Sequence, residues 1–293
     1  LSFNHAALVT SGHSMATGGD VRVVREMPDT TNMEVDRVLD PATSWNSTTT
    51  TIWFRISTPP VVGEQWWLYY GNPSAGAPPA NPNNVFLFSE DFESGTLGKW
   101  NADAAGVFNI STAKAHGGTY AVAVTNQGNK NHWITEQTGT GTDLRMDAWW
   151  YTTDPGNDDI AQGFRSGPVG TFRDYETNLH GGGGLDIAEY IAAGSHFNEF
   201  QGTGGSTPAN TWFHVAMTLV GTQMNVYINP TAAALSGQTA TRSHAVNGDY
   251  ASGGASLRSF AVKNNQFWYV DDIVLRPYQN SEPVLTLGSA QTF

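Results

Sequence analysis

The sequence predicts an all-β protein built from sandwiches or jelly rolls, and three observations support this fold class. The chain of 293 residues carries 10 Trp, 10 Tyr and 14 Phe together with 32 Gly and 14 Pro, a combination that suits short strands joined by turns. Short apolar or alternating segments recur with turn signals between them. Helical periodicity is weak throughout, and at the ambiguous segment around Ala188 we expect a strand.

The first quarter of the chain predicts a small β-sandwich domain over residues 1–76. Its strand candidates are short apolar runs bounded by turn formers, and they lie at 5–9, 20–26, 33–39, 50–56 and 65–70. The Gly, Pro and Asn residues that follow cannot sustain a helix or a central strand. We therefore expect an irregular linker at 77–84.

Residues 85–279 predict a second and larger domain. Its strand candidates follow one another without a crossover helix, which is typical of an antiparallel sandwich or jelly roll. They lie at 85–92, 107–112, 119–125, 132–138, 144–152, 160–166, 175–180, 185–192, 212–221, 223–230, 257–264 and 267–275. Two alternating runs around Gly221 and Thr222 indicate a hairpin. Residues 280–293 then form a tail.

Composition excludes several classes of function. The net charge is −12 with only 14 Lys and Arg in total, which argues against nucleic acid as a partner because phosphate binding needs clustered basic residues. No stretch is long and apolar enough to cross a bilayer. The chain has no Cys, which excludes disulfides, thiolate metal sites and Cys nucleophiles.

Two distant segments each place carboxylates in an apolar, strand-forming run. Asp91 and Glu93 share one face of an extended strand, whereas Asp271 and Asp272 point to opposite faces. Because these segments stand at the two ends of the larger domain, we expect its first and last strands to pair. Clustered carboxylates must be solvated or neutralised, and oxygen-rich sites suit calcium. We expect either a structural Ca²⁺ site or strand-end acids that face water.

The first domain resembles a family of small β domains of unassigned function from bacterial and archaeal surface proteins. The resemblance rests on Asp20 and Arg22, on Trp53, and on the sequence Tyr-Tyr-Gly-Asn-Pro at 69–73, in this order. That family opens with a strand upstream of the position of Leu1. The resemblance therefore implies an open edge in this domain, unless a longer N-terminus or another chain supplies the strand.

The second domain resembles a concanavalin A-like, laminin-G-like jelly roll. The segments DFESGTLGKW, AKAHGGTYAVAV, TWFHVAMTLVGTQMNVYINP and YVDDIVLRP stand in the order that this family has. In its calcium-binding members, acids of the first and last strands hold the ion. The resemblance implies Asp91, Glu93 and Asp271 as metal ligands here, with a backbone carbonyl near His116 as a further one. This fold hosts many functions, so the resemblance implies no particular activity.

Glycoside cleavage is the catalytic alternative. The nearest carboxylate pairs are Asp174 with Glu176 and Asp186 with Glu189, and a glycosidase needs its two groups at a definite separation. The E-x-D-x-x-E run of glycosidases with the concanavalin fold does not occur. The eight His residues have no metal-ligand spacing, and the sequence contains no G-x-S-x-G elbow.

Glycine and acidic runs predict loops rather than sites. The four glycines at 181–184 lack the Lys and Ser or Thr of a phosphate loop, so we expect a hairpin tip. Residues 154–160 gather acids but lack the ligand spacing of an EF-hand, and we expect a solvated loop.

Aromatic pairs leave two interpretations open. Alternation along a strand buries one neighbour of a pair and turns the other outwards, where it packs against another surface or stacks on a sugar. The pairs are Trp66-Trp67, Trp149-Trp150 and Trp268-Tyr269. Two sequons for N-glycosylation begin at Asn46 and Asn109.

These observations favour a non-enzymatic extracellular protein, a structural or adhesive component of a prokaryotic cell surface or filament that calcium stabilises. The alternatives are a carbohydrate-binding module and a polysaccharide hydrolase or lyase. The tail offers an assembly mechanism, because its apolar alternation resembles a strand that could pair with the open edge of another copy. The partners expected are other copies of the chain, other surface proteins or glycans. The assembly segment comprises Pro283, Val284, Leu285, Thr286, Leu287 and Gly288.

Overall fold

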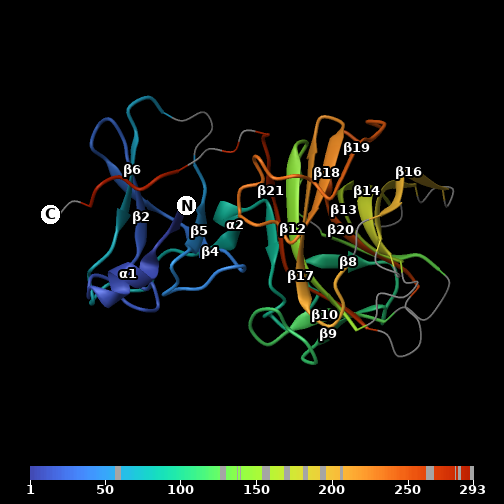
Figure 1. The fold of residues 1–293 in the computed structure, drawn as a ribbon, viewed down its shortest axis with the longest axis horizontal. Coiled ribbons are helices and arrows are strands. Elements are labelled where there is room, and N and C mark those ends of the chain that lie inside the picture. The colour runs from blue at the N-terminus through green and yellow to red at the C-terminus, as the bar shows by residue number, and fades with distance from the viewer. Residues whose placement is uncertain are drawn as a thin grey trace. The chain divides into compact units, whose positions relative to one another are not determined.

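A computed structural model describes most of the chain. The described residues are 1–56, 61–125, 130–136, 138, 140–153, 159–167, 172–180, 184–191, 196–204, 207–261, 267–280, 282 and 285–290. Nearly all of their regular structure is β-strand, which confirms the predicted all-β class. The chain divides into two compact units, Leu1–Phe86 with Pro283–Phe293 (unit 1) and Leu87–Glu282 (unit 2) (Figure 1). No helix in the described residues is long and apolar enough to span a bilayer.

Unit 1 contains two three-stranded sheets. One has the order β1-β5-β4 and the other the order β3-β2-β6. Their apolar faces meet in a core that contains Phe3, Val21, Val23 and Ile52. The strand expected at 33–39 is in fact two strands, one in each sheet. The strands are β1 (Ser2–Phe3), β2 (Arg22–Glu26), β3 (Asn32–Val35), β4 (Arg37–Leu39), β5 (Thr50–Phe54) and β6 (Gln65–Tyr69).

Two short helices in unit 1 differ from the sequence expectations. Helix α1 (His5–Thr10) replaces the strand expected at 5–9, because the Asn4 side chain caps it by accepting the N–H of Ala7 at 2.9 Å. Helix α2 (Pro82–Val85) lies in the stretch expected to be irregular. Asn81 caps α2, and proline suits a first turn, where its missing N–H has no intrahelical partner to lose.

Asp20 connects three segments of unit 1. Its Oδ1 accepts hydrogen bonds from the Ser14 hydroxyl and the Met15 N–H, both at 2.9 Å, and its Oδ2 accepts the N–H of Gly71 at 2.8 Å. Gly71 has a φ of +96°, which glycine adopts without strain. Asp20 and Gly71, two residues on which the resemblance of the first domain rests, therefore have a structural role, because a buried carboxylate must find donors.

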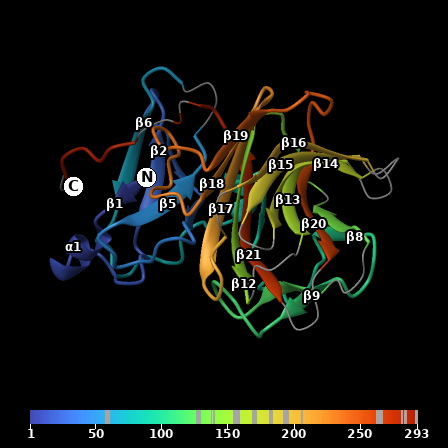
Figure 2. The same cartoon turned by 45° about the vertical axis from the view of Figure 1, so that its right-hand side comes forward.

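Unit 2 is a sandwich of an eight-stranded and a seven-stranded sheet. The first has the order β19-β18-β17-β12-β21-β10-β9, with β7 also paired to β21, and the second has the order β16-β15-β14-β13-β20-β11-β8. Figure 2 shows β17, β12 and β21 in one layer and β13, β14 and β20 in the other. The strands are β7 (Phe88–Glu90), β8 (Trp100–Ala102), β9 (Phe108–Ser111), β10 (Ala121–Val124), β11 (His132–Glu136), β12 (Leu144–Thr152), β13 (Asp159–Ser166), β14 (Arg173–His180), β15 (Leu185–Ile191), β16 (His196–Gly204), β17 (Trp212–Val220), β18 (Gln223–Ile228), β19 (Arg242–Ala245), β20 (Gly254–Ala261) and β21 (Trp268–Pro277).

Three local expectations for unit 2 are confirmed. The first and last strands pair, with Ile273 opposite Glu90. Strands β17 and β18 form the hairpin, with Val220 opposite Gln223. The ambiguous segment around Ala188 is strand β15. The sequence did not reveal the short strands β8 and β19, which carry little apolar periodicity.

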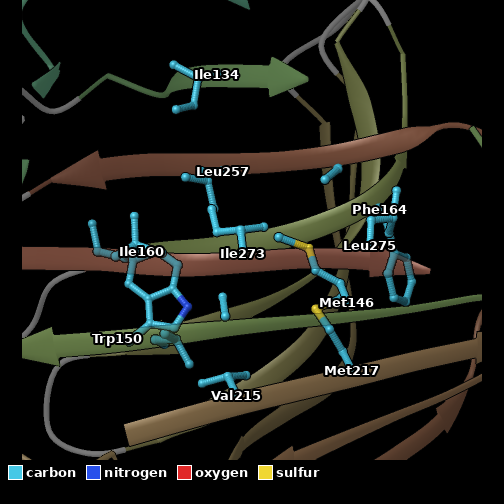
Figure 3. Close-up of a cluster of buried hydrophobic side chains, with 14 of the residues drawn as sticks. Ile134, Met146, Trp150, Ile160, Phe164, Val215, Met217, Leu257, Ile273 and Leu275 are labelled. Carbon is cyan, nitrogen blue, oxygen red and sulfur yellow. The ribbon is translucent and has the colours of Figure 1, made fainter. Parts of the chain in front are cut away.

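The core of unit 2 fills the space between its two sheets. Apolar side chains from both sheets meet there, among them Trp150 and Ile273 from one and Ile160 and Leu257 from the other (Figure 3). Trp150 donates its Nε1–H to the buried Gln162 Oε1 at 2.7 Å, so this indole N–H is satisfied by a side chain of the opposite sheet.

Candidate functional site

Strand β14 turns a row of polar side chains away from the core. Tyr175 and Leu179 belong to the core of unit 2, so the alternation of the strand directs Asp174, Glu176 and Asn178 to the opposite face of the sheet. Ser256 and Arg258 of β20 lie on that same face and contact these residues. We call these five polar residues the polar array.

Arg258 is the centre of the polar array. Its Nε donates to Glu176 Oε2 at 2.9 Å and its Nη2 to Oε1 at 2.7 Å, a two-pronged ion pair in which both side chains are almost fully buried. Its Nη1 donates to Asn131 Oδ1 at 2.7 Å, and its Nη2 also donates to Asn178 Oδ1. The guanidinium group is thus occupied by protein acceptors.

Asp174 is the member of the array with an unsatisfied atom. It is 1% exposed, and its Oδ2 accepts the Ser256 hydroxyl at 2.6 Å. Its Oδ1 is buried and has no hydrogen-bond partner in the part of the chain that the structure describes. Burial and the neighbouring Glu176 carboxylate raise the pKa of Asp174 well above its ordinary value. Asp174 therefore keeps its proton to a higher pH than an exposed carboxyl group does.

The sheet leaves room for these long side chains by using a glycine. Gly163 of β13 lies opposite both Glu176 and Ser256 in the two ladders. A Cβ at this position would overlap Asp174 Oδ2 and approach Ser256 Oγ to 2.7 Å. The absence of a side chain at Gly163 therefore lets Asp174 reach across the strand to Ser256.

Asp186 and Glu189, the second carboxylate pair considered from the sequence, have separate partners in the structure. Asp186 contacts the polar array, since its Oδ1 accepts the Asn178 amide at 2.7 Å, and its Oδ2 lies 2.7 Å from His180 Nε2. Glu189 instead accepts the side-chain amide of Asn247 at 2.8 Å. The odd spacing between Asp186 and Glu189 places them on opposite faces of β15, so they do not form a pair.

Three aromatic rings cover this face. Trp133 of β11 lies 4.5 Å from Phe172 and 4.9 Å from Tyr190 of β15, measured between ring centroids. Arg258 lies 5.6 Å from the Tyr190 ring, and the Asn131 amide donates to the Tyr190 hydroxyl at 3.2 Å. Trp133 Nε1 is buried, and no described residue forms a hydrogen bond with it. We call Trp133, Phe172 and Tyr190 the aromatic cover.

The carboxylates expected to hold calcium contact a loop of backbone N–H groups. Glu93 Oε1 accepts the N–H groups of Thr119 and Tyr120 at 2.7 and 2.8 Å. Asp271 Oδ2 accepts those of His116 and Gly117 at 2.8 and 3.2 Å. We call Glu93, Asp271 and Asp272, gathered around residues 116–120, the carboxylate corner.

Asp271 is fully buried at this corner. Its burial and the adjacent Asp272 carboxylate raise its pKa to about 7, against the opposing effect of its backbone donors. Asp91 is exposed and accepts the N–H of Glu93 at 3.2 Å, and no contact joins it to Asp271 among the described residues. The structure thus brings Glu93, Asp271 and His116 to one loop and leaves Asp91 aside.

The carboxylate oxygens of this corner are suitable calcium ligands, but their geometry does not form a coordination shell. Its side-chain atoms are hard oxygens, the ligands that Ca²⁺ prefers. Within the described ranges, no three His, Asp or Glu side chains are placed to hold one ion. In this arrangement Glu93 Oε1 and Asp271 Oδ2 accept backbone N–H groups, so an ion would have to replace some of these hydrogen bonds.

His116 connects the carboxylate corner to Trp149 on the outer face of the eight-stranded sheet. Its ring stacks on Trp149 at 3.9 Å between centroids and 11° between planes, and its Nδ1 lies 2.6 Å from Asp272 Oδ2. His214 stacks on the same indole at 5.1 Å and 13°, and its Nε2 lies 2.9 Å from Asp147 Oδ1. The indole therefore lies between two His–Asp pairs.

The aromatic pairs of unit 2 divide between core and outer face. Trp150 and Trp268 are fully buried in the core. Trp149 carries the two stacked His rings, and Tyr269 packs with Tyr151 outside the core. In unit 1, Trp66 packs against the core while Trp67 donates its Nε1–H to Glu26 at 2.7 Å.

Other sequence-derived sites lie partly or wholly outside the described residues. These are the glycines at 181–183, the acidic loop at 154–158, and Pro283 and Val284 of the assembly segment. The rest of that segment, from Leu285 to Gly288, is described and contains no strand. Leu285 and Leu287 are 37% and 51% exposed.

Part of the polar array had a recognisable signal in the sequence. The run RDYETNLH places an acid, an acid, an amide and a histidine at every second position, which is how a strand presents one polar face. Arg258, Trp133 and Tyr190 had no such signal, because they reach this face from three other strands.

Comparisons with known proteins give one family match and several weak structural likenesses. A domain of unknown function, DUF2341, matches residues 17–103, which is less than half of the chain. No curated protein matches the sequence. A carbohydrate-binding module, CBM66, from Bacillus subtilis is 12% identical with a TM-score of 0.44, covering 61% of this chain and 95% of that one.

Two further solved structures have similar values. A protein of unknown function with a galectin-like fold from Bacillus subtilis is 8% identical with a TM-score of 0.47, over 65% of this chain and 95% of that one. The exoplasmic/lumenal domain of VIP36, in a form bound to Ca²⁺ and Man3GlcNAc, is 11% identical with a TM-score of 0.44, over 67% and 91%. Likenesses this weak carry no argument about the ligand.

Proposed function

We propose that unit 2 is a non-catalytic module that binds a neutral glycan at the polar array and the aromatic cover. The observation that carries this proposal is a complementary pair of unsatisfied atoms on one face. Among the described residues, Asp174 Oδ1 and Trp133 Nε1 are both buried without hydrogen-bond partners, and each such group has an energetic cost. A sugar hydroxyl both donates and accepts, so sugar hydroxyls can satisfy a carboxyl oxygen and an indole N–H.

The surroundings of these atoms suit a sugar. Sugar rings present apolar C–H faces that pack against aromatic rings, and the aromatic cover supplies three such rings. The array beneath supplies amide, carboxyl and hydroxyl groups that fix orientation. Because Asp174 is almost fully buried, binding requires Trp133 and Tyr190 to separate.

The charges of the array support a neutral glycan over an acidic one. An anionic sugar would need a cation, and the Arg258 guanidinium is already occupied by Glu176, Asn131 and Asn178. It would also lie next to Glu176 and Asp186, which repel it. We therefore expect neutral oligosaccharides to bind and their sialylated or uronic-acid counterparts to bind more weakly.

The same contacts argue against glycoside cleavage. Asp174 and Glu176 share a face and have different electrostatic surroundings, as an acid and base pair would. Both oxygens of Glu176, however, accept hydrogen bonds from Arg258, and the side chain is fully buried. A nucleophile or base must face the reacting bond or a water. Turnover of a polysaccharide that is lost in Glu176→Gln would revive the hydrolase alternative.

The test of the proposed function is binding to a panel of immobilised neutral glycans, followed by calorimetry on any that bind. Trp133→Ala and Asp174→Asn should each weaken binding about tenfold or more, the loss expected when a buried contact is removed. Trp212→Ala, on the outer face of the other sheet, is the matched control and should bind normally. The proposal fails if no neutral glycan binds, or if binding survives both site variants.

We propose separately that calcium stabilises the carboxylate corner. The support is the charge there, with Glu93, Asp271 and Asp272 around one loop, and the raised pKa of Asp271. Such crowding favours either protonation or a cation. Binding would require Ca²⁺ to replace some of the backbone N–H groups that these oxygens now accept.

We also propose that the chain is part of an extracellular surface protein that self-associates through its tail. The support is the exposed, apolar Leu285 and Leu287 and the alternation of their segment. An extended segment of this kind adds to the open edge of a sheet in another copy. Such a contact is head-to-tail, so it would propagate into a filament.

A further inference from the structure

The two N-glycosylation sequons of the chain differ sharply in their surroundings. The first, Asn46-Ser47-Thr48, lies in unit 1 between β4 and β5. Asn46 and Thr48 are exposed, and Asn46 has a φ of +58°, a turn conformation that asparagine tolerates better than most residues. Its side-chain amide has no hydrogen-bond partner among the described residues.

The backbone beneath Asn46 is firmly held. Its N–H donates to His5 Nδ1 at 2.9 Å, and the His5 ring packs edge-on against Trp45 at 5.1 Å between centroids. The Ser47 carbonyl accepts the N–H of Ala6 at 3.0 Å. The side chain of Asn46 therefore projects from an ordered turn, and a group attached to it would extend into solvent without displacing packed atoms.

The second sequon, Asn109-Ile110-Ser111, lies within strand β9. Asn109 pairs with Ala123 of β10 in the ladder. Its Nδ2 donates to the Gly106 carbonyl at 2.8 Å and to Thr125 Oγ1 at 3.2 Å. Ser111 Oγ accepts the N–H of Ala113 at 3.1 Å. The nitrogen that would be modified, Asn109 Nδ2, thus already donates two hydrogen bonds in the folded protein.

We propose that Asn46 is an acceptor for N-linked glycan on the folded protein and that Asn109 is not. In the transfer, Asn46 Nδ2 forms a bond to C1 of an oligosaccharide carried on a lipid diphosphate. The bond from C1 to the phosphate oxygen breaks, the lipid diphosphate leaves with the electron pair, and one amide proton passes to a base. The enzyme must reach and rotate the amide, which the turn at Asn46 permits. At Asn109 the same rotation would break two hydrogen bonds within a paired strand.

The test uses purified, folded full-length chain with a single-subunit oligosaccharyltransferase and a lipid-linked oligosaccharide. Intact mass should show one added glycan, and peptide mapping should place it on Asn46. Thr48→Ala should abolish the addition and Ser111→Ala should leave it unchanged. Both substitutions remove the hydroxyl of a sequon, so each is the matched control for the other.

A urea-unfolded sample of the same chain provides the internal reference, because unfolding releases the Asn109 amide. It should accept glycan at both sequons. If the folded chain accepts none while the unfolded chain accepts glycan at Asn46, or if the folded chain is modified at Asn109, the proposal is overturned.

Discussion

The rings of Trp133 and Tyr190 lie 4.9 Å apart, although β20, β13 and β14 separate their strands in the sheet. Four strand-to-strand steps correspond to about 19 Å along a flat sheet. The two rings therefore reach towards each other over the intervening strands, above Glu176 and Arg258. This contact encloses the polar array, and it explains why charged side chains on an outer sheet face are almost fully buried.

Removing Arg258 should strongly destabilise unit 2. Arg258→Met would leave the buried Glu176 carboxylate without its cation, at a cost of about 3–5 kcal/mol in the free energy of unfolding. The double variant with Glu176→Gln should recover much of this loss, because no uncompensated charge remains. Urea titration followed by Trp fluorescence measures both. A single variant as stable as the wild type would show that the pair is not buried as described.

Gly163→Ala should destabilise the polar array by overpacking. The added Cβ would overlap Asp174 Oδ2 and crowd Ser256 Oγ, which we expect to cost about 1–3 kcal/mol. Gly76→Ala is the matched control, because no atom lies within 4 Å of a Cβ there. Thermal melting of the two variants should differ, and equal melting temperatures would contradict the contact between Asp174 and Gly163.

Asp271 should make the stability of unit 2 depend on pH. Burial and Asp272 raise its pKa to about 7, above the value of about 3.9 expected in the unfolded chain. The contribution of Asp271 to the free energy of unfolding is then fully present below pH about 4 and is lost as the pH rises through about 7. With a chelator present, we compare the melting temperatures of the wild type and of Asp271→Asn. The advantage of the wild type should decrease as the pH rises over this range. A difference that stays constant or rises would contradict the direction of the shift.

Calcium should reverse this loss at alkaline pH. At pH about 8, where Asp271 is ionised, added Ca²⁺ should raise the melting temperature of the wild type, because a ligand that binds only the folded state stabilises it. Asp271→Asn should respond weakly. Asp103→Asn, which changes an acid paired with His132 elsewhere in unit 2, should respond like the wild type. Melting curves unchanged by both chelation and calcium would exclude the site.

Deletion of residues 285–293 should abolish assembly without unfolding unit 2. The deletion keeps Glu282, whose carboxylate pairs with Arg276 and accepts the N–H of Leu235 at 3.2 Å. The double variant Leu285→Asp and Leu287→Asp should act similarly while keeping the full length. Light scattering and electron microscopy measure the assembly state. If both variants assemble as the full chain does, the strand-exchange proposal is wrong.

Local patterns in the sequence determined the all-β class, the β17–β18 hairpin and the shared face of Asp174 and Glu176. Each of these depends on the two-residue period of a strand, which neighbouring residues set by themselves. The same reasoning mistook 5–9 for a strand, because the cap that Asn4 provides outweighed the apolar run there.

The tertiary structure alone decided what these residues contact. Arg258 stands 82 positions from Glu176, and Trp133 and Tyr190 come from strands that the order of the sheet, not the sequence, brings together. The pairing of β7 with β21 followed from the sequence, yet the direction in which Glu93 and Asp271 face did not. Phe92 and Asp272 have positive φ values, and these local departures from extended geometry redirect the adjacent carboxylates towards the loop at 116–120. Strand order and such local irregularities arise from the packing of the whole sandwich, so no local pattern encodes them.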